Sequence, residues 1–445
     1  MKIGRRCLSV ASSVALVVGM TSLLKAQASA SPTASASPAI SAPAPATPHD
    51  AYTLPPDKLA KALALSRIRI TLNIAGTVWG LVFLWLLLAA RGWATIERWT
   101  QWISSRRWVQ GLAFFAAFFI VTTLASLPLD AVAHHFERAY VISVEPWGSW
   151  LVDQAKTLGL ALIFGAPILL LFNWIVRRWP RRYWLGAWAV TLPILALLMF
   201  AEPFFEPLFY QFEPLQKNHP ALVAELEKVA ARTGTDIPPS RMYLMKASAK
   251  SNGLNAYVSG LGATKRIVVW DTTAGRIPND EVLFIFGHES GHYVLHHIPK
   301  GFACSIVGLF FAYWICAVFA AWLIKRFGAR WGAHDLGSRT GFVVLLFVFS
   351  LAMFLTEPVA NAVSRYFEHQ ADVYGQEAIH GIVPDPQKTA VAAFNDLGVA
   401  WLEDPHPNPF IVFWLYSHPS IQQRAEFAEH YDPWANGGHG EFFEQ

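Results

Sequence analysis

Six long apolar runs constrain the fold of this chain more than any other feature. A helix needs about 20 consecutive apolar residues to cross the hydrocarbon core of a bilayer. The composition agrees, because 54% of the 445 residues are hydrophobic, only 15% are charged and the mean hydropathy is +0.33. We predict an all-α polytopic membrane protein with about six transmembrane helices, at residues 70–90, 109–128, 154–175, 185–205, 302–324 and 340–357.

The N-terminus is typical of a secretory signal. Basic residues precede an apolar run from about Cys7 to Leu24, and small residues up to Ala28 suit a cleavage site. We predict that residues 1–28 are a signal peptide or, if uncleaved, an N-terminal anchor. Residues 29–66 are expected to form a linker rich in Ala, Ser and Pro, followed by a short helix, since the linker has too few large apolar side chains to pack.

A polar interval of about a hundred residues separates the fourth and fifth spans, which is too long for a connecting loop. It contains one amphipathic helical pattern, ALVAELEKVAARTG, and two β-branched runs, RMYLMKAS and KRIVVWDTT. We therefore expect an inserted, mainly helical domain with a small β-hairpin or sheet. The rest of the chain is divided into a four-span membrane domain at 67–210, the inserted domain at 211–300, two more spans at 301–358 and a C-terminal part of the inserted domain at 359–445.

Basic side chains concentrate in the loops after the first, third and fifth spans. They are Arg91, Arg98, Arg106, Arg107, Arg177, Arg178, Arg181, Arg182, Lys325, Arg326, Arg330 and Arg339. Loops of this kind face the cytoplasm, so the inserted domain is expected on the opposite side. Together with the leader, this pattern favours a multi-pass protein of the bacterial inner membrane with a periplasmic domain. We expect contact with the lipid bilayer and no nucleic-acid partner, and the oligomeric state stays open.

The stretch FGHESGHYVLHH, Phe286 to His297, carries the strongest chemical pattern. His288 and His292 are four residues apart, so on a helix their rings lie one turn apart on one face. Such a pair can bind Zn²⁺, and the intervening Glu289 can take a proton from water. The alternative is a capped amphipathic helix whose histidines only form hydrogen bonds.

The ends of this histidine helix are also suggested by the sequence. Asn279 and the acidic residues after it suit a helix N-terminus, and Pro299 is expected to end the helix. Gly291 has no side chain, which would let another element pack closely against the helix at this position.

A third ligand is offered by SRYFEHQADVYG, Ser364 to Gly375. This stretch follows Pro358, which is expected to end or kink the sixth span. Glu368 and Asp372 share a helix face, so one could bind metal while the other holds a ligand imidazole. The alternative is an ordinary solvated helical turn. A disulfide framework or a cysteine-based zinc site is not indicated by Cys7, Cys304 and Cys316.

These motifs resemble the M48 zinc metallopeptidases, and most closely their membrane-embedded CaaX prenyl protease 1 branch. HESGH and SRYFEHQAD are joined by three more matching segments. They are FFEPLFYQFEPL (Phe204 to Leu215), SNGLNAYVSGLGATKRIVVWDTT (Ser251 to Thr273) and YSHPSIQQR (Tyr416 to Arg424). The resemblance covers roughly Leu81 to Arg424. It implies that the inserted domain is a zincin-like peptidase domain.

The resemblance also implies roles for single residues. One Zn²⁺ per chain would be bound by His288, His292 and Glu368, with Glu289 as the general base. Asp372 would support the ligands, Asn255 would lie on an edge strand that pairs with extended substrate, and His418 and Arg424 would contact substrate or steady the tetrahedral intermediate. His297 is expected to be structural.

We therefore expect a zinc-dependent membrane endopeptidase, acting on peptide or protein substrates that are membrane-associated, unfolded or prenylated. Quality control or processing of membrane proteins would be its role. The predicted orientation is opposite to that of the eukaryotic prenyl-peptide enzymes, which favours damaged or signal-derived membrane peptides over native prenylated proteins. The alternative is a non-proteolytic transporter or scaffold with a structural zinc, in which Glu202, Glu206 and Glu357 line a pathway.

Overall fold

The computed structural model describes residues 50–235, 237–260 and 262–444, and six of its helical segments are long and apolar enough to cross a membrane. They are Pro56–Ala89, Arg107–Ala139, Trp147–Arg178, Tyr183–Leu208, His297–Trp331 and Arg339–Ala378. Each overlaps one predicted span, so the prediction of a six-span helical protein is confirmed. The predicted signal peptide, and most of the predicted linker, lie outside the described residues.

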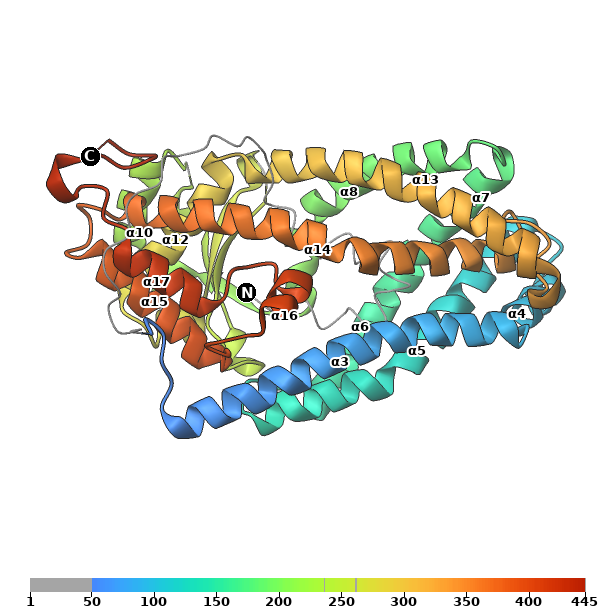
Figure 1. The fold of residues 1–445 in the computed structure, drawn as a ribbon, viewed down its shortest axis with the longest axis horizontal. Coiled ribbons are helices and arrows are strands. Elements are labelled where there is room, and N and C mark those ends of the chain that lie inside the picture. The colour runs from blue at the N-terminus through green and yellow to red at the C-terminus, as the bar shows by residue number, and fades with distance from the viewer. Residues whose placement is uncertain (1–49, 236, 261, 445) are drawn as a thin grey trace.

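The membrane helices form one long bundle that extends away from the rest of the molecule (Figure 1). In chain order they are α3 (Pro56–Ala89), α5 (Arg107–Ala139), α6 (Trp147–Leu160), α7 (Ala166–Arg178), α8 (Tyr183–Phe205), α13 (His297–Trp331) and α14 (Arg339–Ala378). A π-helical turn, η2 (Ala161–Gly165), joins α6 to α7, and the short helix α4 (Gly92–Ile103) lies at the far end of the bundle. Buried aromatic and aliphatic side chains of these helices form one of two hydrophobic clusters.

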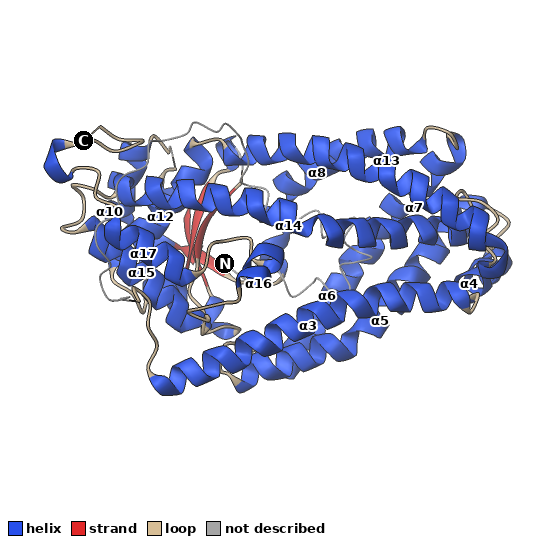
Figure 2. Cartoon of the chain, viewed as in Figure 1, coloured by secondary structure: helices blue, strands red, loops and turns tan. Residues whose placement is uncertain are grey.

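The other end of the molecule carries the inserted domain, which surrounds a small sheet (Figure 2). Its strands are β1 (Phe212–Pro214), β2 (Met242–Met245), β3 (Ala256–Ser259) and β4 (Arg266–Trp270), in the spatial order β1-β2-β4-β3. The β2 and β4 strands are parallel, whereas β3 and β4 form an antiparallel pair. The predicted small sheet is present, and β3 is one of its edges.

The helices of this domain include the amphipathic one predicted from the sequence, α10 (Pro220–Thr233), which ends at Gly234 with φ +65°. The others of eight residues or more are α12 (Asn279–Val294), α15 (Pro386–Trp401) and α17 (Ile421–His430). Shorter ones are α9 (Leu215–Asn218), α11 (Asp271–Ala274) and α16 (Pro409–Leu415).

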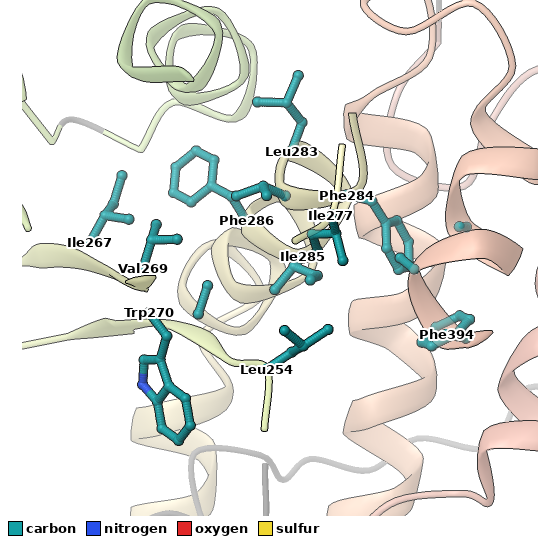
Figure 3. Packing of buried hydrophobic residues seen from close by; sticks show 14 of the residues in the cluster. Leu254, Ile267, Val269, Trp270, Ile277, Leu283, Phe284, Ile285, Phe286 and Phe394 are labelled. Carbon is teal, nitrogen blue, oxygen red and sulfur yellow. The ribbon is translucent and has the colours of Figure 1, made fainter. Parts of the chain in front are cut away.

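Helix α12 runs through the centre of the second hydrophobic cluster (Figure 3). On one side it faces the sheet, where Ile267 and Val269 of β4 lie. On the other side Phe284 packs edge-on against Phe394 of α15, with ring centroids 5.1 Å apart. Every residue from Glu281 to His288 is buried. The helix with the histidine pair is therefore held by the core on almost all sides.

Two expected helix ends differ from the structure. Pro358 does not end the sixth span, because α14 continues as one helix from Arg339 to Ala378. A proline removes one backbone hydrogen bond, but packed helices in membrane proteins tolerate that loss. The histidine helix α12 was expected to end at Pro299, but it ends earlier, at Val294. Between α12 and α13, His296 takes a left-handed conformation with φ 58°. Pro299 thus lies in the first turn of α13, where a proline costs no helical hydrogen bond.

The segment just before the first span packs against the C-terminal part of the chain. Tyr52 is fully buried, its backbone N–H donates to Gln422 and its hydroxyl donates to the carbonyl of Glu403. Ala62 and Leu65 of α3 belong to the same hydrophobic cluster as α12. The predicted boundary at residue 66 falls inside α3, and the one at residue 358 falls inside α14. Both helices are shared by the membrane and inserted parts.

Glycines allow α12 and α14 to approach until their backbones touch. A Cβ atom on Gly375 would lie 2.7 Å from the backbone nitrogen of His288, and one on Gly287 would lie 3.0 Å from the carbonyl oxygen of Gly375. One turn along α12, a Cβ atom on Gly291 would lie 2.9 Å from Cβ of Tyr374. The close approach expected at Gly291 is present, and it extends along the whole contact.

Substituting Gly375 tests this contact. In Gly375→Ala the new methyl group would meet backbone atoms that have no room to move, so we expect the thermal unfolding temperature of the purified protein to fall. Overpacking of this kind costs about 1–3 kcal/mol. The matched control is Gly308→Ala on α13, where an added Cβ atom would meet nothing within 4 Å. An alanine is better than glycine in a helix by about 1 kcal/mol, so equal effects of the two variants would contradict the proposed close contact.

Candidate metal centre

Three potential ligands from two helices converge at the α12–α14 contact. Nε2 of His288 lies 3.1 Å from Nε2 of His292. The carboxylate of Glu368, on α14, faces both rings, with Oε2 at 3.4 Å from Nε2 of His288 and Oε1 at 3.6 Å from Nε2 of His292. One donor atom from each residue lies within 4.8 Å of the other two, which is close enough for all three to bind a single metal ion. The structure thus brings together the three predicted metal ligands.

The buried ion pair of Asp372 and Arg424 contacts His288. Oδ1 of Asp372 lies 2.9 Å from Nδ1 of His288, on the side of the ring away from the ligand cluster. Both oxygens of Asp372 also accept hydrogen bonds from Arg424, at 2.5 and 2.9 Å. The Arg424 side chain is 3% exposed and its guanidinium stacks over the Phe394 ring. This geometry makes Arg424 a partner of Asp372, and its expected contact with substrate or with the tetrahedral intermediate stays a prediction.

His292 has a similar support, which sequence reasoning missed. Its Nδ1 lies 3.1 Å from Nδ1 of His297, while Nε2 of His297 lies 3.2 Å from Oε1 of Gln370. His297 is fully buried and stacks on Phe367. A chain of hydrogen bonds thus runs from the His292 ring to α14. The left-handed turn at His296 creates this contact, and helical spacing from His292 does not reveal it.

Glu289 lies between the ligand cluster and the edge strand. The backbone N–H of Val258 in β3 donates a hydrogen bond to its carboxylate. Burial raises the pKa of Glu289 to about 7, against the opposing effects of His288 and of the Val258 hydrogen bond. A carboxylate with a pKa near neutrality is well suited to accept and return a proton.

His418 also reaches this cluster. Its Nε2 lies 2.9 Å from Oε1 of Glu368 and its Nδ1 lies 2.9 Å from Oγ of Ser417. Burial lowers the pKa of both His418 and His292, the latter to about 3, so both rings are neutral at ordinary pH. A neutral imidazole can donate one hydrogen bond from its N–H and offer one lone pair.

Asn255 immediately precedes β3, whereas the resemblance implied a place on the edge strand itself, and its pairing with substrate stays a prediction. Its backbone N–H donates to Oγ1 of Thr273, and its carbonyl accepts from the same hydroxyl and from the backbone N–H of Trp270. These bonds fix where the edge strand begins.

The edge strand is also attached to the membrane helices through Glu206. The hydroxyl of Tyr257 donates to Oε1 of Glu206 at 2.9 Å, and Arg266 donates to Oε2 at 2.5 Å. Glu206 follows directly after α8. One of the three glutamates considered for a transport pathway is therefore engaged in holding the sheet.

The donor set fits a divalent metal of the zinc type. Two imidazole nitrogens and one carboxylate oxygen are the ligands of catalytic zinc sites, which leave one further position for water or substrate. The rings are held from behind by a carboxylate and by another imidazole, as metal-binding histidines commonly are. A helical membrane bundle whose inserted domain carries this site defines the class of integral membrane metallopeptidases.

Comparison with known proteins identifies the family. Residues 216–432 match peptidase family M48, and residues 41–211 match the family described as CAAX prenyl protease N-terminal, five membrane helices. The chain is 33% identical over 379 residues to a metalloprotease of Bacillus subtilis named YhfN, covering 84% of this chain and 86% of that protein. The chain therefore belongs to peptidase family M48, with the membrane domain of the CAAX prenyl proteases.

Eukaryotic relatives and a solved structure support the same assignment. The chain is 26% identical over 332 residues to CAAX prenyl protease 1 of Saccharomyces cerevisiae, over 71% of each chain. It is 25% identical over 360 residues to the human CAAX prenyl protease 1 homolog, over 71% of this chain and 73% of that one. A crystal structure of S. mikatae Ste24p has the same fold, with a TM-score of 0.74 and 23% identity over 96% of this chain and 99% of that one.

The support behind His288 makes a prediction about metal affinity. In Asp372→Asn the negative charge behind the imidazole is lost, and the ring becomes a weaker ligand. We expect zinc affinity, measured by competition with a chelator, to fall about 10–100-fold, as for other groups that hold metal ligands. Glu429→Gln, an exposed carboxylate on the same helix as Arg424, is the matched control. Equal affinities of the two variants would show that Asp372 does not tune this ligand.

Proposed function

We propose that the chain is a zinc-dependent endopeptidase that cleaves extended peptide segments at the membrane. One observation carries the proposal. His288, His292 and Glu368 converge from two helices, and Glu289 lies beside them, hydrogen-bonded to the edge strand of a sheet. A structural zinc would have no use for a carboxylate held beside its ligands but not among them, so this arrangement favours hydrolysis over the transporter or scaffold.

The proposed roles follow from where each side chain lies. A Zn²⁺ held by the three ligands would supply Lewis acidity to the scissile carbonyl and to the attacking water. Glu289 accepts the proton of that water and returns it to the leaving amine. Asp372, through His288, and His297, through His292, keep the two imidazoles in their tautomers and orientations.

His418 is placed to act on the carbonyl oxygen of the substrate. It contacts Glu368 and is 18% exposed, so its ring is open to the site. In this structure the ring's one N–H, at Nε2, points at Glu368. Once that carboxylate binds Zn²⁺, the same N–H would be available to donate to the oxygen on which negative charge develops, and preorganised donors of this kind are often the largest single catalytic contribution.

The substrate is proposed to bind by strand addition at β3. The free edge of a sheet pairs with the backbone of an extended peptide, independent of its side chains. The β3 edge lies next to Glu289, so a peptide paired there would run past the site. Folded segments cannot pair in this way, which favours unfolded or membrane-associated peptides, including the prenylated class named for the eukaryotic relatives.

We further propose that the peptidase domain faces the periplasm of a bacterial inner membrane. The basic loops at the opposite end of the bundle support this orientation. In a compartment without prenylated proteins, unfolded or signal-derived membrane peptides are the expected substrates. A reporter fused after Gln445 reads the orientation directly: activity of a periplasm-specific reporter is expected, and activity of a cytoplasm-specific reporter would reverse it.

The decisive variant is Glu289→Gln. The amide is nearly isosteric with the carboxylate but cannot accept the proton, so cleavage should fall by at least about 10²–10⁴-fold while zinc binding stays intact. The measurement is zinc content together with cleavage of an unstructured peptide by the purified protein, before and after treatment with a chelator and after return of Zn²⁺.

Two comparisons sharpen this experiment. An unmodified peptide and its farnesylated form, tested side by side, show whether the lipid is required or only tolerated. Asp280→Asn, an acid at the start of the same helix, is the control for loss of a negative charge. Undiminished zinc-dependent cleavage by Glu289→Gln would rule out the role assigned to this residue, and wild-type protein that binds zinc but cleaves neither peptide would remove the proposed function.

A further inference from the structure

A second polar site lies at the opposite end of the molecule from the metal centre. A cavity of about 860 Å³ opens where α4, α5, α7, α13 and the start of α14 come together. Figure 1 shows these helix ends at the far end of the bundle, away from the sheet. The catalytic proposal does not use any residue in this cavity.

The cavity carries an excess of positive charge. Four cationic side chains line it, Arg107, Arg177, Lys325 and Arg339, against two carboxylates, Glu97 and Asp335. With histidine neutral, this leaves a net charge of two positive units. Arg107 and Arg177 each lie close enough to Arg339 to repel its positive charge, so these cations surround the same space.

The two carboxylates are already engaged by the start of α14. Glu97 accepts hydrogen bonds from the backbone N–H groups of Arg339 and Thr340, at 3.0 and 2.9 Å, and from the Thr340 hydroxyl. Asp335 accepts from the backbone N–H of Ser338. These bonds use the negative charge to stabilise the helix N-terminus.

Three of the cations remain without an acidic partner. Arg339 pairs with Glu97, but none of the ion pairs among residues 50–235, 237–260 and 262–444 includes Arg107, Arg177 or Lys325. They come from three different helix ends and are exposed around one cavity. Guanidinium and ammonium groups arranged in this way are suited to bind a phosphate group.

The surroundings of the cavity are those of a membrane surface. The cavity wall includes Val176 and Ile324, on the helices that lead into the bilayer. At the same end of the bundle, Trp102 is 90% exposed and Trp108 is 57% exposed. Tryptophans are enriched at the level of lipid headgroups.

Apolar surface continues from the cavity toward the bilayer. Trp174 of α7 and Val318 and Trp322 of α13 are exposed on the neighbouring helix surfaces. A lipid whose phosphate lies among the cations could therefore lay its acyl chains along these side chains. A soluble phosphate would use the cations alone.

We propose that this cavity is a binding site for the phosphate headgroup of an anionic phospholipid. The cations Arg107, Arg177 and Lys325 bind the phosphate, and the apolar surface of α7 and α13 contacts the acyl chains. The lipid would thereby hold together the ends of α5, α7 and α13 at the membrane surface.

The test is lipid binding by the full chain purified in detergent. Native mass spectrometry measures the binding of phosphatidylglycerol and of phosphatidylcholine with equal acyl chains. We expect wild type to prefer phosphatidylglycerol. Arg177→Gln/Lys325→Gln is expected to bind it about 25-fold more weakly, since each basic side chain near an anionic lipid surface contributes about fivefold.

Two controls separate a site from overall surface charge. Arg181→Gln/Arg330→Gln removes the same charge from exposed positions at the same end of the bundle, outside the cavity, and is expected to bind like wild type. Arg177→Lys/Lys325→Arg keeps both charges and is expected to retain the preference for phosphatidylglycerol.

Four results would overturn the proposal. One is equal binding by wild type and Arg177→Gln/Lys325→Gln, and another is the same loss in the Arg181→Gln/Arg330→Gln control. The third is displacement of the lipid by inorganic phosphate at millimolar concentration, which would assign the site to a soluble anion. Thermal unfolding of each variant shows whether it is folded, and a charge-conserving variant that folds but loses the lipid also contradicts the proposed role of charge.

Discussion

The contact between α12 and α14 is the constraint on which the metal centre depends. Two imidazoles on one helix and a carboxylate on another can share one metal only if the helix backbones come closer than ordinary side chains allow. Gly287, Gly291 and Gly375 remove the side chains that would hold the helices apart. The ligands themselves could tolerate a small shift by changing rotamer, whereas the backbone contact at Gly375 leaves no such freedom.

The site is further fixed because a carboxylate anchors α14 at each end, half-buried at the N-terminal end and fully buried at the C-terminal end. At its N-terminus, Glu97 accepts from the backbone N–H groups of Arg339 and Thr340. Near its C-terminus, the fully buried Glu377 accepts from the hydroxyl of Tyr431 and from the backbone N–H groups of Glu441, Phe442 and Phe443. A displacement of Glu368 along the helix axis would break hydrogen bonds at both ends.

Helical spacing pointed to His288 and His292 and offered Glu368 or Asp372 as a third ligand, and the choice of Glu368 came from the resemblance to the M48 family. His288 with His292, and Glu368 with Asp372, are each one turn apart, and all four lie at the α12–α14 contact. Features that depend on how helices meet were missed or misjudged. Pro358 was expected to end or kink the sixth span, and the first alternative is wrong, because tertiary packing keeps α14 helical through the proline. The contact of His297 with His292 depends on a left-handed residue, and the place of Arg424 behind Asp372 depends on where α17 docks.

The arrangement of the edge strand explains why a membrane domain and a peptidase domain are built as one unit. A peptide that pairs with β3 transmits any pull on its chain to the sheet. Glu206, directly after α8, accepts hydrogen bonds from Tyr257 and Arg266 of the sheet. In the loop before β3, Lys250 forms ion pairs with Glu145, just before α6, and with Asp153, within α6. Arg69 of α3 also links Glu137 of α5 to the carbonyl of Trp401 in α15. Because these bonds involve charged groups that are largely removed from water, breaking any one leaves a partly buried charge without its partner. The edge strand, the candidate metal ligands and the spans therefore keep one relative position, and a peptide bound at β3 as proposed would have to be extended.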